Sequence, residues 1–226
     1  MIDLKAETLI SINGLNITNT LLTSYLVILI ISVFLFNLRY KLNPTKIQTI
    51  LEVFYESVYN FWHGITHLNN QKIFTFCLTF LIYISVANLI ILFPPFEAFY
   101  LNKNSHHIHL FRSVFSDMNM TLALALISVI ITNILGLLKL GVKFIKKFLS
   151  PLGILELISE FAKIISFSFR LFGNIFGGKV LLMIISFLIS LLVPSIFIGL
   201  EIFVGIIQSF IFFVLTSVFI KVALEH

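Results

Sequence analysis

Apolar residues fill most of this chain in long runs, and polar residues gather at the ends of those runs. About 20 consecutive apolar residues suffice for a helix to cross the hydrocarbon layer of a bilayer. Five runs of this kind cover residues 20–38, 73–93, 120–140, 154–193 and 195–224. The pattern predicts an all-α integral membrane protein. It forms a single domain over residues 1–226, whose polar N-terminus, residues 1–19, precedes the first span.

The last two runs are longer than an upright span requires. A helix rises 1.5 Å per residue, so the run over 154–193 would extend about 60 Å. Gly173, Gly177 and Gly178 lie within it and permit a kink or close helix packing. We therefore expect the last two helices to be long and strongly tilted in the membrane.

Residues 45–68 follow a different pattern. Apolar residues recur there at helical spacing and polar residues take the opposite side, which predicts an amphipathic helix. The apolar set is Ile47, Ile50, Leu51, Phe54, Val58 and Phe61, and the polar set is Gln48, Glu52, Glu56 and Asn60. Two placements remain open: the helix lies on the inner membrane surface, or it packs on the spans as part of a loop.

Basic residues indicate the topology, because short loops on the inner side of a membrane carry an excess of Lys and Arg. The loops after the first and third spans hold Arg39, Lys41, Lys46, Lys139, Lys143, Lys146 and Lys147. The loop between the second and third spans holds only Lys103 and Arg112. The N-terminus is therefore predicted outside and the C-terminus inside, as an odd number of spans requires.

Composition agrees with a membrane protein and excludes several other classes. The chain is 59% hydrophobic and 11% charged, against about 25% charged in an average soluble protein. Its net charge of +5 forms no basic stripe on a soluble face, which excludes a nucleic-acid partner. No nucleotide-binding motif occurs, so we expect no cofactor and no catalytic site of its own.

Cysteine and histidine usage predicts neither a disulfide nor a metal site. Cys77 is the sole cysteine, so an intrachain disulfide is impossible. His63 and His67 stand one helical turn apart without a third ligand, and the other histidines of interest, His106, His107 and His109, fall in a predicted outer loop.

Arg170 lies inside the apolar run over 154–193, where a fixed cation costs about 2.5–3.5 kcal/mol on insertion scales. On a helical wheel a stripe of polar residues surrounds it within a sector of about 80°. The stripe consists of Glu156, Glu160, Lys163, Arg170 and Asn174, with Ser166 at its edge. Such a stripe faces protein or a water-filled passage; the alternative is that Arg170 forms a permanent salt bridge that holds helices together.

The last run carries its own polar face. Glu201, Gly205 and Gln208 fall within about 60° of one another on the helical wheel. Lys179 stands on the opposite side of its helix from Arg170, at a distance from Pro194 that allows it to approach Glu201. We hypothesise a buried ion pair between Lys179 and Glu201, because either charge alone in lipid would be expensive.

Polar residues in the second and third spans have ordinary structural explanations. Ser116 or Asp117 can cap the helix that begins near residue 120. Asn88 is expected to hydrogen-bond a neighbouring helix, with the lining of a passage as the other possibility.

Around Arg170 the local sequence becomes diagnostic. Arg170-Leu171-Phe172-Gly173-Asn174 resembles the signature of subunit a of F-type ATP synthase, the stator channel beside the c-ring. Further blocks of the chain resemble the same family: Glu156 and Ser166 before the arginine, Ser116 to Thr121 (an Asp-x-Asn-x-Thr start that contains Asn119), Asn88-Leu89 to Pro94, Gln208 to Phe212, and the ending Glu225-His226. The resemblance covers nearly the whole chain.

The resemblance implies a role for each matched residue. Arg170 would face the essential carboxylate of the c-ring, release its proton and block a leak between two offset half-channels. Asn174 and Gln208 would line the outer half-channel, and Glu156 and Ser166 the inner exit. The remaining proton-path candidates are Asn88, Asp117, Asn119, Lys179 and Glu201.

The resemblance also implies the surroundings of the chain. The partners would be the c-ring, the peripheral-stalk b subunits and the lipid bilayer. The location would be a bacterial inner membrane, or alternatively the inner membrane of an organelle. The alternative function, from a different class, is a secondary transporter or a structural membrane subunit that uses the polar stripe for packing.

Three positions depart from the family pattern. Many bacterial members carry Glu where this chain has Lys179, and His where it has Glu201. Ile91 stands where an acid is common and leaves no titratable group there. Glu201 is therefore either the relay carboxylate of the entry channel or the partner of Lys179 in a structural ion pair.

Overall fold

The computed structural model describes residues 8–12, 15–37, 46–91, 100–103, 106–141, 144, 153–188 and 192–225. Within them the helices are α1 (Asn19–Asn37), α2 (Lys46–Thr66), α3 (Gln71–Ile91), the short 3-10 helix η1 (Val114–Ser116), α5 (Met118–Leu140), α7 (Gly153–Leu188) and α8 (Leu192–Glu225). Five of these helices, α1, α3, α5, α7 and α8, are long and apolar enough to cross a membrane. The expectation of an all-α membrane protein with five spans is confirmed.

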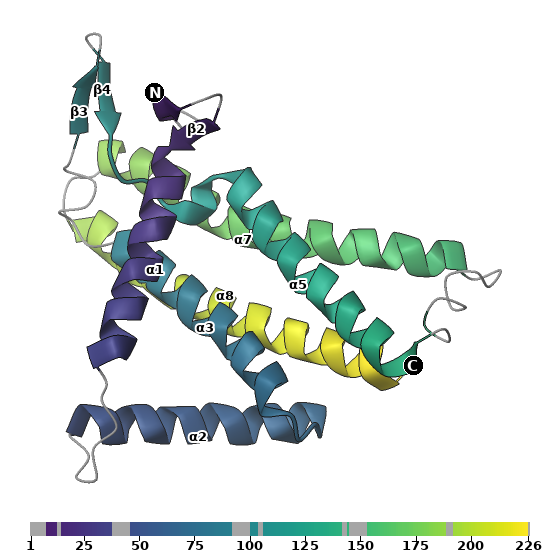
Figure 1. Cartoon of the computed structure of the whole chain (residues 1–226). Helices are drawn as coiled ribbons and strands as arrows, with labels where there is room; N and C mark the ends of the chain where they lie inside the picture. The colour runs from purple at the N-terminus through teal and green to yellow at the C-terminus, as the bar shows by residue number, and fades with distance from the viewer. Residues whose placement is uncertain are drawn as a thin grey trace.

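The last two helices are as long as their apolar runs. α7 has 36 residues and α8 has 34, and both run obliquely to α1 (Figure 1). Gly173, Gly177 and Gly178 stay within the continuous helix α7 and do not end it. α8 begins at Leu192, before Pro194 rather than after it. Proline is tolerated in a first helical turn because the N–H groups there have no partner within the helix.

Two short antiparallel hairpins were not predicted. β1 (Thr8–Ile12) pairs with β2 (Leu15–Thr18), and β3 (Tyr100–Lys103) pairs with β4 (His106–His109). In Figure 1 both hairpins lie at the end of the molecule where α1 begins. The Asn13-Gly14 pair in the sequence is the turn signal that could have predicted the first hairpin. The predicted end of the second span at Pro94-Pro95 falls outside the described residues.

α2 lies across the other end of the bundle, transverse to α1 (Figure 1). Its C-terminal half packs on α3 and α8: Trp62 is fully buried, and its ring lies 5.4 Å from that of Phe74. Lys221 of α8 donates a hydrogen bond to the Ile65 carbonyl at the end of α2. Ile47 and Ile50 in the N-terminal half remain exposed. Helix α2 therefore packs on the spans at one end and exposes an apolar face at the other. Its position on the inner membrane surface stays a prediction.

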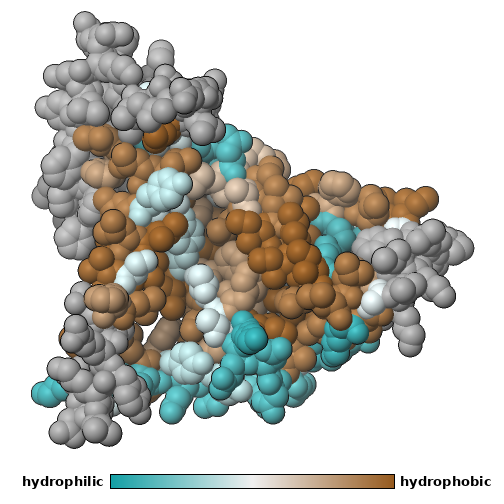
Figure 2. Space-filling view, in the orientation of Figure 1, coloured by the Kyte–Doolittle hydropathy of each residue, from teal (hydrophilic) through white to brown (hydrophobic). Residues whose placement is uncertain are grey.

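Two clusters of buried apolar side chains form the core. The larger cluster joins α1, α3, η1, α5, α7 and α8, and Phe212 of α8 lies at its centre, 4.5 Å from Phe167 and 5.1 Å from Phe80 between ring centroids. The second cluster joins α2, α3 and α8. The surface of the spans is largely brown in Figure 2, while hydrophilic residues gather along α2. Lipid therefore replaces water as the solvent of the spans.

Pairs of hydroxyl groups connect the spans inside this core. Ser85 of α3 meets Ser209 of α8 at 2.6 Å, Thr121 of α5 meets Ser168 of α7 at 3.0 Å, and Ser128 of α5 meets Thr216 of α8 at 3.0 Å. Interhelical hydrogen bonds of this kind contribute roughly 0.6–2 kcal/mol each in membranes. Small polar residues thus fix how the spans pack.

Candidate functional site

Arg170 lies near the middle of α7, partly exposed at the edge of the bundle. Its Nη2 donates a hydrogen bond to Ser166 Oγ, one turn earlier, at 3.0 Å. No carboxylate of the described residues lies within ion-pair distance of Arg170. The alternative of a permanent salt bridge inside this chain therefore finds no support in the described part of the structure.

Asn174 lies one turn after Arg170 and connects α7 to α8. Its Nδ2 donates to Gln208 Oε1 at 2.6 Å, and Gln208 is 3% exposed. The two amides were predicted from separate stretches of sequence, and the antiparallel packing of α7 on α8 brings them into contact. Arg170, Asn174 and Gln208 therefore form one continuous polar surface that leads from the edge of the bundle into its interior.

Asn88 of α3 continues this surface on the far side of α8. Its Nδ2 donates to the Gly205 carbonyl at 3.1 Å, which confirms the expected helix–helix hydrogen bond. A Cβ on Gly205 would stand 3.1 Å from Asn88 Cβ, so glycine is what allows the close approach. Asn88 Oδ1 is buried and has no hydrogen-bond partner among the described residues. A buried acceptor without a protein partner indicates a place for a water molecule.

Glu201 lies on α8 about two turns before Gln208 and is 7% exposed. Its carboxylate lies against α7, where a Cβ on Gly178 would stand 3.4 Å from Glu201 Oε1. Lys179 is the next residue of α7 and is partly buried. The structure thus brings the carboxylate to the segment of α7 that carries Lys179, while the ion pair between the two side chains stays a prediction.

The polar stripe on α7 divides into two parts. Near the beginning of the helix, Lys163 Nζ forms an ion pair with Glu160, and Asn133 of α5 donates to the other carboxylate oxygen at 2.9 Å. Lys163 Nζ also lies 5.0 Å from the ring centroid of Phe219 on α8. Two charges of the stripe therefore stabilise each other and the packing of three helices, and they do not join Arg170.

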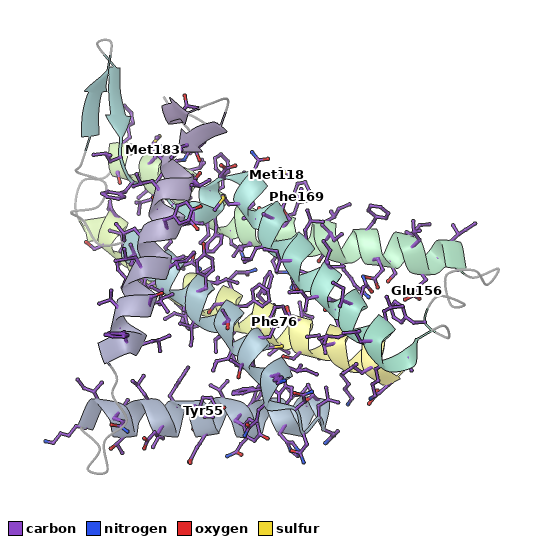
Figure 3. The ribbon with its side chains drawn as sticks, viewed as in Figure 1. Tyr55, Phe76, Met118, Glu156, Phe169 and Met183 are labelled. Carbon is purple, nitrogen blue, oxygen red and sulfur yellow. The ribbon has the colours of Figure 1, made fainter. Side chains whose placement is uncertain are left out.

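Glu156 belongs to the same end of α7. Figure 3 shows Glu156 near the beginning of α7 and Met183 near its end, with Phe169 between them. Glu156 is partly exposed. Glu156 lies near the start of α7, and Glu201 lies against Gly178 in its second half. The two carboxylates are therefore on opposite sides of Arg170 along the helix.

Asp117 caps α5, as its position before the third span predicted. Its Oδ1 accepts from the Asn119 backbone N–H at 3.0 Å, and its Oδ2 accepts from Thr20 Oγ1 of α1 at 3.1 Å. Asn119 is exposed. Thr121 of this segment forms a hydrogen bond with Ser168 of α7. Ser168 lies two positions before Arg170.

The hydroxyl pairs Thr121–Ser168 and Ser85–Ser209 lie beside the site and were not predicted. The signal that could have revealed them is weak, because serine and threonine inside a span usually bond to their own helix. No group of three or more His, Cys, Asp or Glu side chains in the described part of the chain could hold a metal ion. The arrangement suits the binding and release of a proton by the buried carboxylate of Glu201.

Five apolar helices in the described part of the chain, packed around buried amides and a carboxylate, define an integral membrane protein. The model of the ATP synthase A chain family matches residues 19–221. The chain therefore belongs to this family, and it is an integral membrane subunit of the membrane sector of ATP synthase.

Curated relatives support the same assignment. The chain is 34% identical over 197 residues to ATP synthase subunit a of Oleidesulfovibrio alaskensis, a match that covers 83% of this chain and 77% of the relative. It is 32% identical over 191 residues to the protein of the same name from Desulfosudis oleivorans, covering 81% and 77%. The Mycobacterium tuberculosis relative is 30% identical over 221 residues, covering 92% and 87%.

Proposed function

We propose that this chain conducts protons through two offset half-channels at its interface with the rotating c-ring and so couples a proton gradient to ATP synthesis. The observation that carries the proposal is Arg170, a partly exposed cation without a carboxylate partner among the described residues of its own chain. An arginine guanidinium stays protonated in proteins. Its partner is then the carboxylate of a neighbouring subunit, which loses its proton when it passes Arg170.

The outer half-channel follows polar residues of α7, α8 and α3. Glu201 would accept the proton, and Gln208, Asn174 and a water molecule at Asn88 would carry it towards the c-ring. Asp117 and Asn119 lie near the beginning of α1, at the predicted outer surface. This route agrees with an N-terminus outside and a C-terminus inside a bacterial inner membrane.

The inner half-channel would use Glu156 and Ser166 on the first half of α7. Ser166 accepts a hydrogen bond from Arg170, so it lies directly on the inner side of the arginine. Each proton that crosses contributes about 2.3 kcal/mol per 100 mV of membrane potential. Because the two half-channels do not meet, a proton must ride the rotating ring between them, and its energy drives rotation. The c-ring and the b subunits are the partners that this function requires.

The test is ATP-driven proton pumping by the complete ATP synthase in membrane vesicles. The Arg170→Ala variant should lose coupled pumping, because nothing then discharges the ring carboxylate or separates the half-channels. Lys139→Ala, which removes an exposed cation at the end of α5, is the matched control and should pump normally. Coupled and undiminished pumping by Arg170→Ala would refute the proposal. The family match favours this function over a secondary transporter or a purely structural subunit.

A further inference from the structure

A cavity of about 450 Å³ lies between α1, α3, η1 and α5, away from the polar surface around Arg170. Its walls are mainly apolar, and they include Ile28 and Ile31 of α1, Phe80 of α3, and Leu124 and Ile127 of α5. Cavities that bind small ligands have volumes of roughly 300–1,000 Å³ and are mostly apolar. The volume and lining of this cavity are therefore those of a binding site.

Water is a poor occupant of this cavity. A buried water molecule needs two to four polar partners. Ser24 and Tyr83, two of the hydroxyls on the wall, bond to each other at 2.7 Å, and Thr79 donates to the Thr75 carbonyl at 2.8 Å. The occupant must be apolar along most of its length.

The length of the cavity is close to that of a lipid acyl chain. Its lining on α1 runs from Ser24 to Leu35, which corresponds to a rise of about 16 Å along the helix. The hydrocarbon layer is about 30 Å thick, so this length is about half of it. α1 and α5 diverge with increasing distance from η1 in Figure 1, and both helices line the cavity. A single acyl chain has the length and polarity that the cavity requires.

A cation lies beside the end of the cavity that is nearest the start of α1. Arg112 precedes the lining residues Val114 and Phe115, and its backbone N–H donates to Thr23 Oγ1 at 3.2 Å. Its Nε donates to Ser116 Oγ at 3.1 Å, which fixes the side chain near η1. A guanidinium carries five N–H donors in a planar fork that matches a phosphate. The positive charge of Arg112 therefore lies at one end of an apolar cavity. A phospholipid has the same arrangement, with a charged phosphate at one end of an apolar chain.

We propose that this cavity binds a phospholipid, with one acyl chain between α1 and α5 and its phosphate at Arg112. Among the described residues of α1, Val27 alone is a buried member of the larger core cluster. The lipid would therefore complete the packing of α1. The proposal is independent of the proton route, because none of the cavity residues belongs to that route.

The test uses the complete ATP synthase in vesicles that contain a phosphatidylglycerol with a photoactivatable acyl chain. Labelling should fall on peptides of α1 and α5. Arg112→Gln should weaken labelling about tenfold by removing the charged phosphate contact. Ala123→Phe, which fills the cavity from α5, should also reduce it strongly. Leu122→Phe is the matched control, because Leu122 is an exposed neighbour outside the cavity lining.

Two results would overturn the proposal. One is equal labelling of these peptides in the unmodified complex, in Arg112→Gln and in Ala123→Phe. The other is a photocrosslink from a benzoylphenylalanine at position 28 to another protein chain, which would identify the cavity as a protein interface. If Ala123→Phe fails to assemble, Arg112→Gln still decides the outcome, because Arg112 is only partly buried.

Discussion

At the scale of single residues, the polar groups of α3, α7 and α8 differ in whether they can take up a proton. Asn88, Asn174 and Gln208 are amides, and the structure holds each of them in an interhelical hydrogen bond. Glu201 is the one titratable side chain among these four residues, and it is 7% exposed. In the proposed outer half-channel, Glu201 is therefore the group among these four that can hold a proton.

The Glu201→Gln variant tests whether this carboxylate is a relay. Proton flux through the complex should fall by about tenfold or more, as expected when a general acid–base group is removed, while assembly is retained. Glu225→Gln, at the exposed end of α8, should leave flux unchanged. Unchanged flux in Glu201→Gln would mean that Glu201 has only a structural role beside Lys179.

At the scale of helices, ionic and polar contacts hold α7 and α2 in place. Glu160 and Lys163 of α7 engage Asn133 of α5 and the ring of Phe219 on α8. Lys221 of α8 donates to the last turn of α2, where exposed carbonyl groups and the helix dipole favour a cation. The half of α7 that carries Glu156 is therefore anchored to α5 and α8 two to three turns before Arg170.

Removing one member of the Glu160–Lys163 pair should cost more than removing both. Lys163→Leu leaves a partly buried carboxylate without its cation, a change that costs about 3–5 kcal/mol in buried pairs and less here, because both side chains keep some exposure. The double variant Glu160→Leu/Lys163→Leu should recover much of this loss. The thermal stability of the purified complex measures both effects, and equal losses in the single and double variants would contradict the coupling.

At the scale of the whole molecule, five candidate spans predict that the two ends of the described chain lie on opposite sides of the membrane. The two hairpins and α2 mark these opposite ends of the bundle (Figure 1). Thr8 in β1 and Glu225 at the end of α8 are both exposed, so each provides a reporter of its side.

Cysteine labelling tests the topology in a Cys77→Ser background. A membrane-impermeant maleimide should modify Thr8→Cys from the outside and Glu225→Cys from the inside only. Ile130→Cys, which is exposed on the apolar surface of α5, should resist the reagent from both sides because lipid covers it. Modification of both terminal positions from the same side would exclude the proposed orientation.

The sequence by itself determined the membrane class, the five spans and the amphipathic helix, and it made Arg170 a candidate functional residue. Each of these follows from local hydrophobicity, from helical periodicity or from the cost of a charge in lipid, which short stretches of sequence already contain. The same local chemistry predicted a helix cap at Ser116 or Asp117, and the structure shows Asp117 as the cap.

Only the tertiary structure decided which polar residues meet. The contacts Asn174–Gln208 and Asn88–Gly205 join residues 34 and 117 positions apart, and the packing of α3, α7 and α8 sets their register. It likewise joined Glu160 of α7 to Asn133 of α5, left Arg170 without a carboxylate among the described residues, and opened an apolar cavity beside Arg112. These outcomes depend on the rotation and translation of whole helices against one another, which the pattern along any single helix does not specify.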